Sequence, residues 1–259
     1  MLIVVSPAKA LDFESPLVTK KHSQPAMLER SKELVDVLST KTPQDLQSLM
    51  SISDSLAELN FDRYQDWSTP FTTDNSRPAI LSFSGDTYIG LNAGATFSER
   101  DFTHAQKTLR ILSGLYGVLR PLDLIQAYRL EMGSKLRTNS SNDLYGFWGT
   151  EISEKLNSDL MESPGEPVLI NLASNEYFKS VNPDEVNGPL VTPTFLDKKK
   201  GGDYKMVSFY AKRARGSMAS WIIRNRVKAA NELQNFDEEG YRYDRDRSDA
   251  LKPVFLRSN

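Results

Sequence analysis

The segment over residues 109–133, LRILSGLYGVLRPLDLIQAYRLEMG, constrains the fold most, because two closely spaced glycines interrupt an apolar pattern. Before the glycines, apolar residues recur at helical spacing from Phe102 to Leu112. After them the apolar pattern resumes, with Pro121 placed as in a first helical turn. The spacing therefore predicts a helix, a glycine hairpin over residues 114–117 and a second helix.

The predicted hairpin consists of Gly114, Leu115, Tyr116 and Gly117. Glycine accepts positive φ and allows another backbone to approach closely. Such a hairpin would present backbone N–H groups beside a helix N-terminus, which suits a bound phosphate. An ordinary turn between two helices, ended by a glycine cap, fits the same spacing. The glycines alone leave both interpretations open.

Composition excludes several classes of site. The chain has 259 residues, of which 39% are hydrophobic and 25% are charged, as in a soluble globular protein. It contains no cysteine, which excludes disulfides, thiolate metal sites and a cysteine nucleophile. The two histidines, His22 and His104, are far apart and lack metal-ligand spacing, so we expect neither a metal nor another cofactor. There is no Walker loop, dinucleotide fingerprint or Gly-x-Ser-x-Gly motif.

The remaining chain predicts a mixed α/β (α+β) fold. Apolar runs bounded by turn residues predict strands over residues 2–5, 79–83, 168–172, 190–196 and 205–210. Apolar stripes at helical spacing predict helices over residues 25–38, 43–50, 54–67, 98–112, 145–160 and 211–226. A terminal β-pair is expected over residues 240–243 and 254–256. Because no linker rich in Pro, Gly or Ser divides the chain, we expect one domain over residues 1–259, with a mixed sheet flanked by helices.

Positive charge is concentrated on particular elements, although the net charge is only −2. Residues 204–231 contain seven basic residues and no acidic one. Arg215 falls on the flank of an apolar helical face, so it needs an acidic partner or a bound anion. Lys9, Lys179 and Lys212 also lie near predicted strand ends or helix starts. Cations that converge in one cleft would bind an anion, and a lysine desolvated among them could react as a nucleophile or base.

Four long motifs resemble the peroxide stress protein YaaA family: SPAKALD at residues 6–12, LSGLYGVLRPLD at 112–123, INLASNEYFK at 170–179 and SFYAKRARG at 208–216. The resemblance implies a bacterial cytosolic protein, induced by hydrogen peroxide, that limits iron-driven oxidative damage. It also implies a single mixed α/β domain with a basic cleft and a helix-hairpin-helix element that binds duplex DNA. By motif, that element is the segment over residues 114–117. The chain departs from the family pattern at Ala10, where threonine is expected, and its Gly-Leu-Tyr-Gly spacing is one residue longer than the usual Gly-hydrophobic-Gly of DNA-binding hairpins.

Two functional hypotheses follow. In the first, the protein binds the phosphate backbone of double-stranded DNA with little base specificity, through the hairpin and the cations Lys9, Arg120, Lys179, Lys212, Arg213 and Arg215. In the second, an enzyme uses the same cleft for a nucleotide or small anion, with Lys9 or Lys212 as the reactive group, oriented by Asp12, Asp86 or Glu176. Direct iron sequestration is the weakest alternative. We expect the cytoplasm, because residues 1–5 are too short for a signal peptide and no apolar run approaches about 20 residues.

Overall fold

A five-stranded sheet at the centre of the computed structural model has the strand order β6-β5-β1-β8-β9. Its strands are β1 (Leu2–Val5), β5 (Leu109–Ser113), β6 (Gly117–Leu119), β8 (Leu169–Leu172) and β9 (Leu190–Val191). Strand β1 runs parallel to both of its neighbours, and β6 runs antiparallel to β5. All four β1 side chains are buried, as is typical of a parallel strand covered on both faces. The structure describes residues 1–198 and 202–258.

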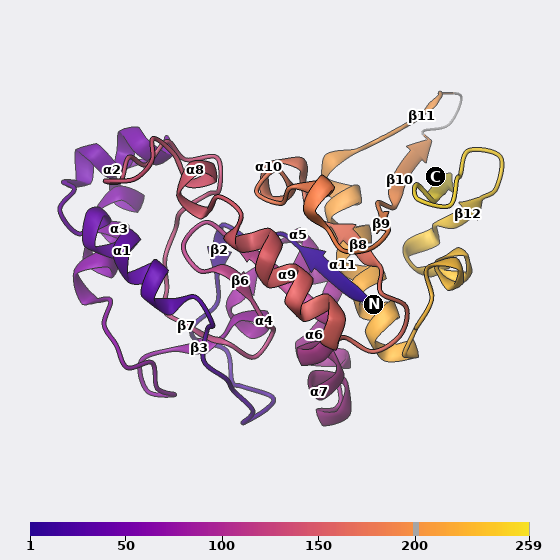
Figure 1. Ribbon diagram of the computed structural model, residues 1–259, viewed down its shortest axis with the longest axis horizontal. Coiled ribbons are helices and arrows are strands. Elements are labelled where there is room, and N and C mark those ends of the chain that lie inside the picture. Colours follow the sequence, from indigo (N-terminus) through magenta and orange to yellow (C-terminus); the bar gives the residue numbers. More distant parts are fainter. Residues whose placement is uncertain (199–201, 259) are drawn as a thin grey trace.

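Helices surround this sheet (Figure 1), and the first three, α1 to α3, lie together at one end of the molecule with α8. The helices are α1 (Leu28–Leu38), α2 (Pro43–Met50), α3 (Asp54–Asp66), α4 (Ala79–Ser82), α5 (Asp86–Leu91), α6 (Ala93–Thr96), α7 (Glu99–Thr108), α8 (Leu144–Trp148), α9 (Glu151–Glu162), α10 (Asn175–Phe178) and α11 (Ser208–Asn225). Short 3-10 turns are η1 (Pro183–Glu185), η2 (Ala230–Asn235) and η3 (Glu238–Gly240). The mixed α/β fold class is therefore confirmed.

A second sheet, with the order β11-β10-β13-β12, is built mainly from the C-terminal part of the chain. Its strands are β10 (Thr194–Lys198), β11 (Tyr204–Lys205), β12 (Arg242–Asp244) and β13 (Val254–Ser258). The antiparallel pairing of β12 with β13 confirms the predicted terminal β-pair. Two small ladders join β2 (Ala10–Leu11) to β4 (Phe83–Ser84), and β3 (Arg77–Pro78) to β7 (Leu124–Ile125). The lysine-rich turn in the sequence falls on residues 199–201, which lie outside the described residues.

Helix starts follow local side-chain chemistry closely. The Thr42 side chain accepts a hydrogen bond from the Asp45 N–H, and Asp45 accepts one from the Thr42 N–H in return. Ser98 and Asp101 form the same reciprocal capping box at the start of α7. Each box satisfies backbone donors that the first helical turn leaves unpaired. The sequence patterns that predicted these starts are therefore confirmed.

The predicted helix-hairpin-helix is wrong. Helix α7 ends at Thr108, the chain continues as β5, and residues 114–116 form a three-residue β-hairpin loop into β6. Gly117 closes the loop with a φ of +65°, which glycine adopts without strain. Every residue of β5 is buried, so apolar side chains recur at almost every position and imitate a helical stripe. The chain between β6 and residue 143 contains no helix, since β7 and extended segments occupy it.

Three smaller predictions also need correction. Residues 79–82 form the short helix α4 instead of a strand. The strand expected over residues 205–210 ends at Lys205, and α11 has already begun at Ser208. The helix expected over residues 145–160 is divided at Gly149, which has a φ of +48°. In each case the local backbone path depends on tertiary contacts that the apolar composition of the segment does not show.

Helices α5 and α11 cross at very close range. A Cβ atom built on Gly216 would lie 1.8 Å from the Thr87 carbonyl oxygen, and one on Gly90 would lie 2.0 Å from the Arg213 carbonyl oxygen. Only glycine allows two backbones to approach in this way. The crossing therefore fixes the first half of α11 against the loop and helix that follow β4.

Candidate functional site

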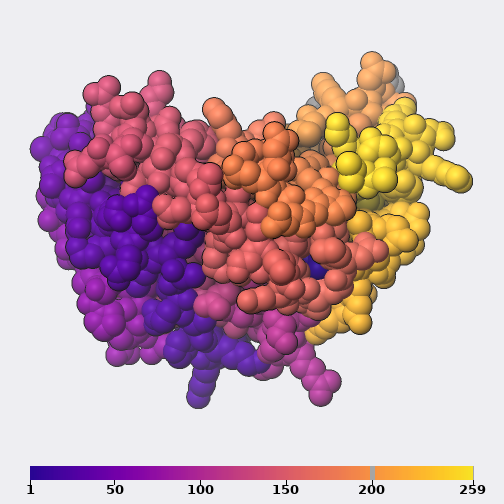
Figure 2. All heavy atoms as spheres, in the orientation of Figure 1, coloured from indigo at the N-terminus to yellow at the C-terminus, as the bar shows by residue number. Residues whose placement is uncertain are grey.

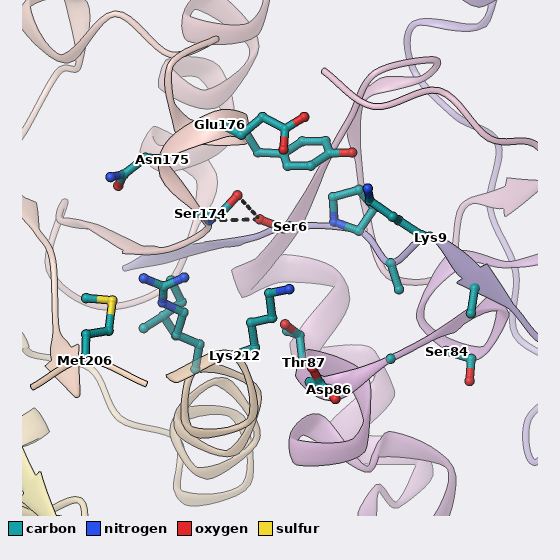
Figure 3. Close-up of a pocket in the computed structure, with 17 residues that line it drawn as sticks. Ser6, Lys9, Ser84, Asp86, Thr87, Ser174, Asn175, Glu176, Met206 and Lys212 are labelled. Carbon is teal, nitrogen blue, oxygen red and sulfur yellow. Dashed lines mark hydrogen bonds between the residues drawn. The ribbon is translucent and has the colours of Figure 1, made fainter. Parts of the chain in front are cut away.

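A cavity of about 640 Å³ opens at the carboxyl ends of β1 and β8 (Figure 3). In sheets with parallel strands, ligands commonly bind at this edge, where loops leave neighbouring strands together. The residues that line the cavity are Ser6, Pro7, Ala8, Lys9, Ala10, Ser84, Gly85, Asp86, Thr87, Leu172, Ser174, Asn175, Glu176, Tyr177, Met206, Lys212 and Arg215.

Hydrogen bonds at the base of the cavity join the ends of the two central strands, β1 and β8. The Ser174 N–H donates a hydrogen bond to the Ser6 hydroxyl at 2.9 Å, and that hydroxyl donates to Ser174 Oγ at 3.3 Å. The Tyr88 hydroxyl donates to the Ser6 carbonyl oxygen at 3.2 Å, from helix α5. Ser6 therefore ties three separate segments of the chain together at the base of the site.

Helix α11 brings the basic side chains to the opposite wall. Lys212 points from α11 toward the loop that carries Ser6 (Figure 3). Arg215, one turn further along, is half-buried, and this burial lowers the pKa of its guanidinium. Within residues 1–198 and 202–258, neither Lys212 nor Arg215 has an acidic partner within ion-pair distance. A half-buried guanidinium without a carboxylate is a group that a bound anion would satisfy.

Lys9 lines the same cavity, but an acidic residue already holds it. Its ammonium group lies 3.0 Å from Glu131, whose same carboxylate oxygen also lies 3.1 Å from Arg129. The Lys9 side chain is 66% exposed, so its position is adjustable. Lys9, Lys212 and Arg215 give the cavity three cationic groups against the carboxylates of Asp86 and Glu176.

The other predicted site residues are distributed differently. Lys179 lies near the cavity, 4.8 Å above the Tyr145 ring, but does not line it. Arg213 faces away from it and pairs with Glu239 at 3.1 Å. Arg120 pairs with the buried Asp123 and donates a hydrogen bond to the Gln24 carbonyl oxygen. Of the four cations expected to converge in one cleft, Lys9, Lys212 and Arg215 line this cavity and Lys179 does not. Arg120 and Arg213, also expected at the DNA contact, are instead paired with carboxylates outside the cavity lining.

The hairpin residues belong to the core. Leu115 and Tyr116 have no exposed surface, and the Tyr116 hydroxyl accepts hydrogen bonds from Trp67 and from the Gln126 N–H. Burial raises the pKa of Tyr116. A Cβ on Gly114 would lie 2.4 Å from the Leu130 carbonyl oxygen, so this glycine is also enclosed. Residues 113–117 are all buried, so their backbone N–H groups are not exposed for the phosphate contact that we expected of them.

Several polar residues of the cavity were not predicted individually, namely Ser6, Thr87 and Ser174, and neither was the apolar Met206. Each follows a strand end or precedes a helix start, which is the signal that could have identified them. Asp12 was expected to orient a reactive lysine, but it caps its own loop by accepting the N–H groups of Glu14 and Ser15. Among the described residues there is no group of three or more His, Asp or Glu side chains that could hold a metal ion.

Known proteins resemble this chain over nearly its whole length. The model of the family described as peroxide stress protein YaaA matches residues 1–247. The chain belongs to the peroxide stress protein YaaA family. Similar relatives include two proteins named UPF0246 protein, from Saccharophagus degradans (51% identical) and Colwellia psychrerythraea (54% identical), each aligned over 257 residues and 99% of both chains.

Three of the four motifs that resemble the YaaA family contribute to the cavity. The first supplies Ser6 and Lys9, the third supplies Ser174, and the fourth supplies Lys212 and Arg215. The second motif instead forms the buried hairpin of β5 and β6. In the part of the chain that the structure describes, no helix is both long enough and apolar enough to cross a bilayer.

Proposed function

We propose that this member of a peroxide-stress family binds DNA through its phosphate backbone at the mouth of the cavity, with little base specificity. The observation that carries the proposal is the pair Lys212 and Arg215, two cations on one helix face without an acidic partner among the described residues. Lys9 adds a third cationic group to the lining of the same cavity. The contact surface is therefore the wall formed by α11 and the strand ends, in place of the hairpin.

The proposal also offers a link to oxidative damage. A protein that neutralises phosphates displaces the cations condensed on them. Ferrous iron held at the backbone would be among these cations, so bound protein would lower the amount of iron that reacts with peroxide next to DNA. The surface seen in Figure 2 is notched along its upper edge, between the segments around α8 and β11, which leaves α10 and its neighbourhood open to a large ligand.

The test is fluorescence anisotropy with a labelled duplex of about 20 base pairs over a salt series. Phosphate binding requires affinity to fall steeply with salt, with a log–log slope of about −0.9 per neutralised phosphate. Replacing Lys212 and Arg215 by alanine should weaken binding to all sequences and reduce that slope by about 2.

Arg213→Ala is the matched control for that experiment. Arg213 lies on the same helix but pairs with Glu239, so its loss should change affinity little. Binding that does not depend on salt, or that the double variant leaves intact, would overturn the proposal. An equal loss in Arg213→Ala would show that α11 contributes only general charge.

A second candidate is an enzyme that acts on a nucleotide or another small anion. The cavity volume favours it, since 640 Å³ lies within the range of small-molecule pockets, about 300–1,000 Å³. Lys9 or Lys212 would then be the reactive group, and Asp86 or Glu176 would orient it. A mononucleotide that displaces the duplex completely at micromolar concentration would favour this candidate over DNA binding.

A further inference from the structure

A second cavity lies at the opposite end of β8 from the cavity that Lys212 and Arg215 line, the basic cavity. The second cavity has a volume of about 750 Å³ and opens where residues 166–168 lead into β8. The 3-10 turn η2 and the loop between β12 and β13 supply most of its other walls. Its volume lies within the range of small-molecule sites, about 300–1,000 Å³. It shares no lining residue with the basic cavity.

The walls of the second cavity are largely apolar. Pro167, Pro189 and Pro253 line it, together with the buried Val191 and with Leu251, which is 47% exposed. Proline has no backbone N–H to offer a ligand. The carbonyl groups of Pro189, Leu251 and Pro253 already accept hydrogen bonds from other backbone N–H groups. These walls therefore offer a ligand mainly apolar contact.

The two acidic residues in the lining are bound to the walls themselves. Asp249 accepts the N–H groups of Leu251 and Lys252, each at 2.8 Å, and so shapes the loop between β12 and β13. Glu166 accepts the Ala230 N–H at 3.0 Å, which ties η2 to the segment before β8. Both carboxylates therefore hold the shape of the cavity.

The cation of the second cavity is Arg245. Its side chain, like those of Asn231 and Gln234, has no hydrogen-bond or ion-pair partner among the described residues, 1–198 and 202–258. A guanidinium binds a carboxylate through two parallel N–H···O bonds, and the two amides offer further donors. A single polar cluster beside apolar walls is typical of a site that orients a small molecule with one charged end.

The charge of the lining selects against polyanions. One arginine faces two carboxylates here, whereas the basic cavity has three cations against two carboxylates. A phosphate dianion or a nucleic-acid backbone would meet net repulsion in the second cavity. A ligand with a single negative charge and an apolar body satisfies both the arginine and the walls.

We propose that the second cavity binds a small aromatic carboxylate, with the carboxylate paired to Arg245 and the ring against Leu251 and the three prolines. Asn231 and Gln234 donate hydrogen bonds to the same carboxylate. This site is separate from the proposed DNA contact, so it can be occupied whether or not DNA is bound.

Isothermal titration calorimetry with naphthoate as the probe tests this inference. The wild-type protein is expected to bind naphthoate saturably at one site. Arg245→Gln should weaken binding about tenfold, because charge-assisted hydrogen bonds are among the stronger ones. Leu251→Asn should also weaken binding, through the loss of apolar contact.

Arg247→Gln is the matched control. It makes the same change in charge two residues away, but Arg247 pairs with Asp244 at 3.1 Å and does not line the cavity, so naphthoate binding should be unchanged. The double variant of Lys212→Ala and Arg215→Ala should also bind naphthoate as the wild type does.

Four results would overturn the inference. The first is the absence of saturable naphthoate binding to the wild-type protein. The second is an equal loss in Arg247→Gln and Arg245→Gln, which would show that only general charge matters. The third is a loss in the double variant, which would place the probe in the basic cavity. The fourth is equally tight binding of naphthylmethylamine, which would show that the carboxylates of the lining select a cation.

Discussion

Gly216 lies so close to Thr87 that a methyl group added to the glycine would stand 1.8 Å from the Thr87 carbonyl oxygen. Thr87 and Lys212 line the same cavity, from α5 and α11 respectively. The contact between Gly216 and Thr87 therefore sets the distance between these two walls of the site. Because the obstructing atom belongs to the backbone, no side-chain rotation can relieve the clash.

Gly216→Ala should destabilise the protein by about 3 kcal/mol, the upper end of what overpacking usually costs. Denaturant unfolding followed by tryptophan fluorescence measures this change. Gly94→Ala is the control, since the nearest atom to a Cβ at Gly94 lies 4.0 Å away and alanine favours the helix. A Gly216→Ala protein as stable as the Gly94→Ala protein would show that α5 and α11 can separate freely.

The decrease in the free energy of unfolding at acidic pH should depend on Asp159. Burial alone would raise the pKa of Asp159, but hydrogen bonds and charge from Arg110 and Lys155 outweigh it and lower that pKa. A carboxylate with a lowered folded-state pKa stabilises the fold above its unfolded pKa, and this contribution is lost as pH falls through the folded value. Asp159→Asn should cost about 3 kcal/mol at pH 7, since it leaves the buried Arg110 without its charge partner.

Urea unfolding at several pH values tests this prediction. The wild type should lose stability relative to the variant as pH falls below about 4, because the unfolded chain then binds a proton at Asp159 while the folded carboxylate, with its lowered pKa, does not yet do so. Asp36→Asn serves for comparison, because Asp36 forms an exposed ion pair with Lys32 and its loss should stay within about 0.5 kcal/mol. Parallel pH profiles for the wild type and Asp159→Asn would refute the assignment.

Glu131→Gln should strengthen DNA binding. Glu131 neutralises Lys9 at the mouth of the cavity, with 3.0 Å between the charged atoms. Its removal frees Lys9 for a phosphate, and a gain of about twofold to fivefold is expected, since a pair whose lysine is 66% exposed contributes less than about 1 kcal/mol. Anisotropy titration at low salt measures the change. Glu58→Gln on α3 makes the same change in net charge, and an equal gain there would mean that only net charge matters.

Tyr116→Phe tests whether the hairpin takes part in DNA binding. The variant removes a buried hydroxyl that accepts from Trp67 and the Gln126 N–H and donates to the Gln126 carbonyl oxygen. Stability should fall by about 1–3 kcal/mol, because buried polar groups lose their partner. DNA affinity of the folded variant should be unchanged. A tenfold loss of DNA affinity with the fold intact would show that the hairpin is part of the DNA-binding interface.

The sequence was most informative where a single local cause decides the structure. Four consecutive apolar residues at the start of the chain predicted the buried strand β1, and Ser98 with Asp101 predicted the start of α7. The sequence places Lys9 near a strand end and Lys212 near a helix start, and in the structure both line the same cavity. Those sequence signals are local, and the parallel sheet then brings the residues that carry them together at one edge.

The same reasoning failed where distant contacts decide. Leu109 and Leu112 fit a helical stripe, but their segment pairs with β1 across about a hundred residues and is covered on both faces. Glycines 114 and 117 are present because Leu130 and Trp148 pack against them, not because a ligand approaches. Likewise, the sequence could not show that Glu239 pairs with Arg213 while Arg215 has no carboxylate partner among residues 1–198 and 202–258.

The position of β1 in the sheet has a consequence for how the protein is made. Ile3 pairs with Leu109 on one side and with Ile170 on the other, so β1 gains its second neighbour only after synthesis has continued as far as Ile170. Until then a fully apolar strand lacks its sheet, a situation in which nascent chains are prone to association. Chain-spanning pairings of this kind also slow folding. The cavity, whose floor joins Ser6 to Ser174, is therefore assembled late in biogenesis.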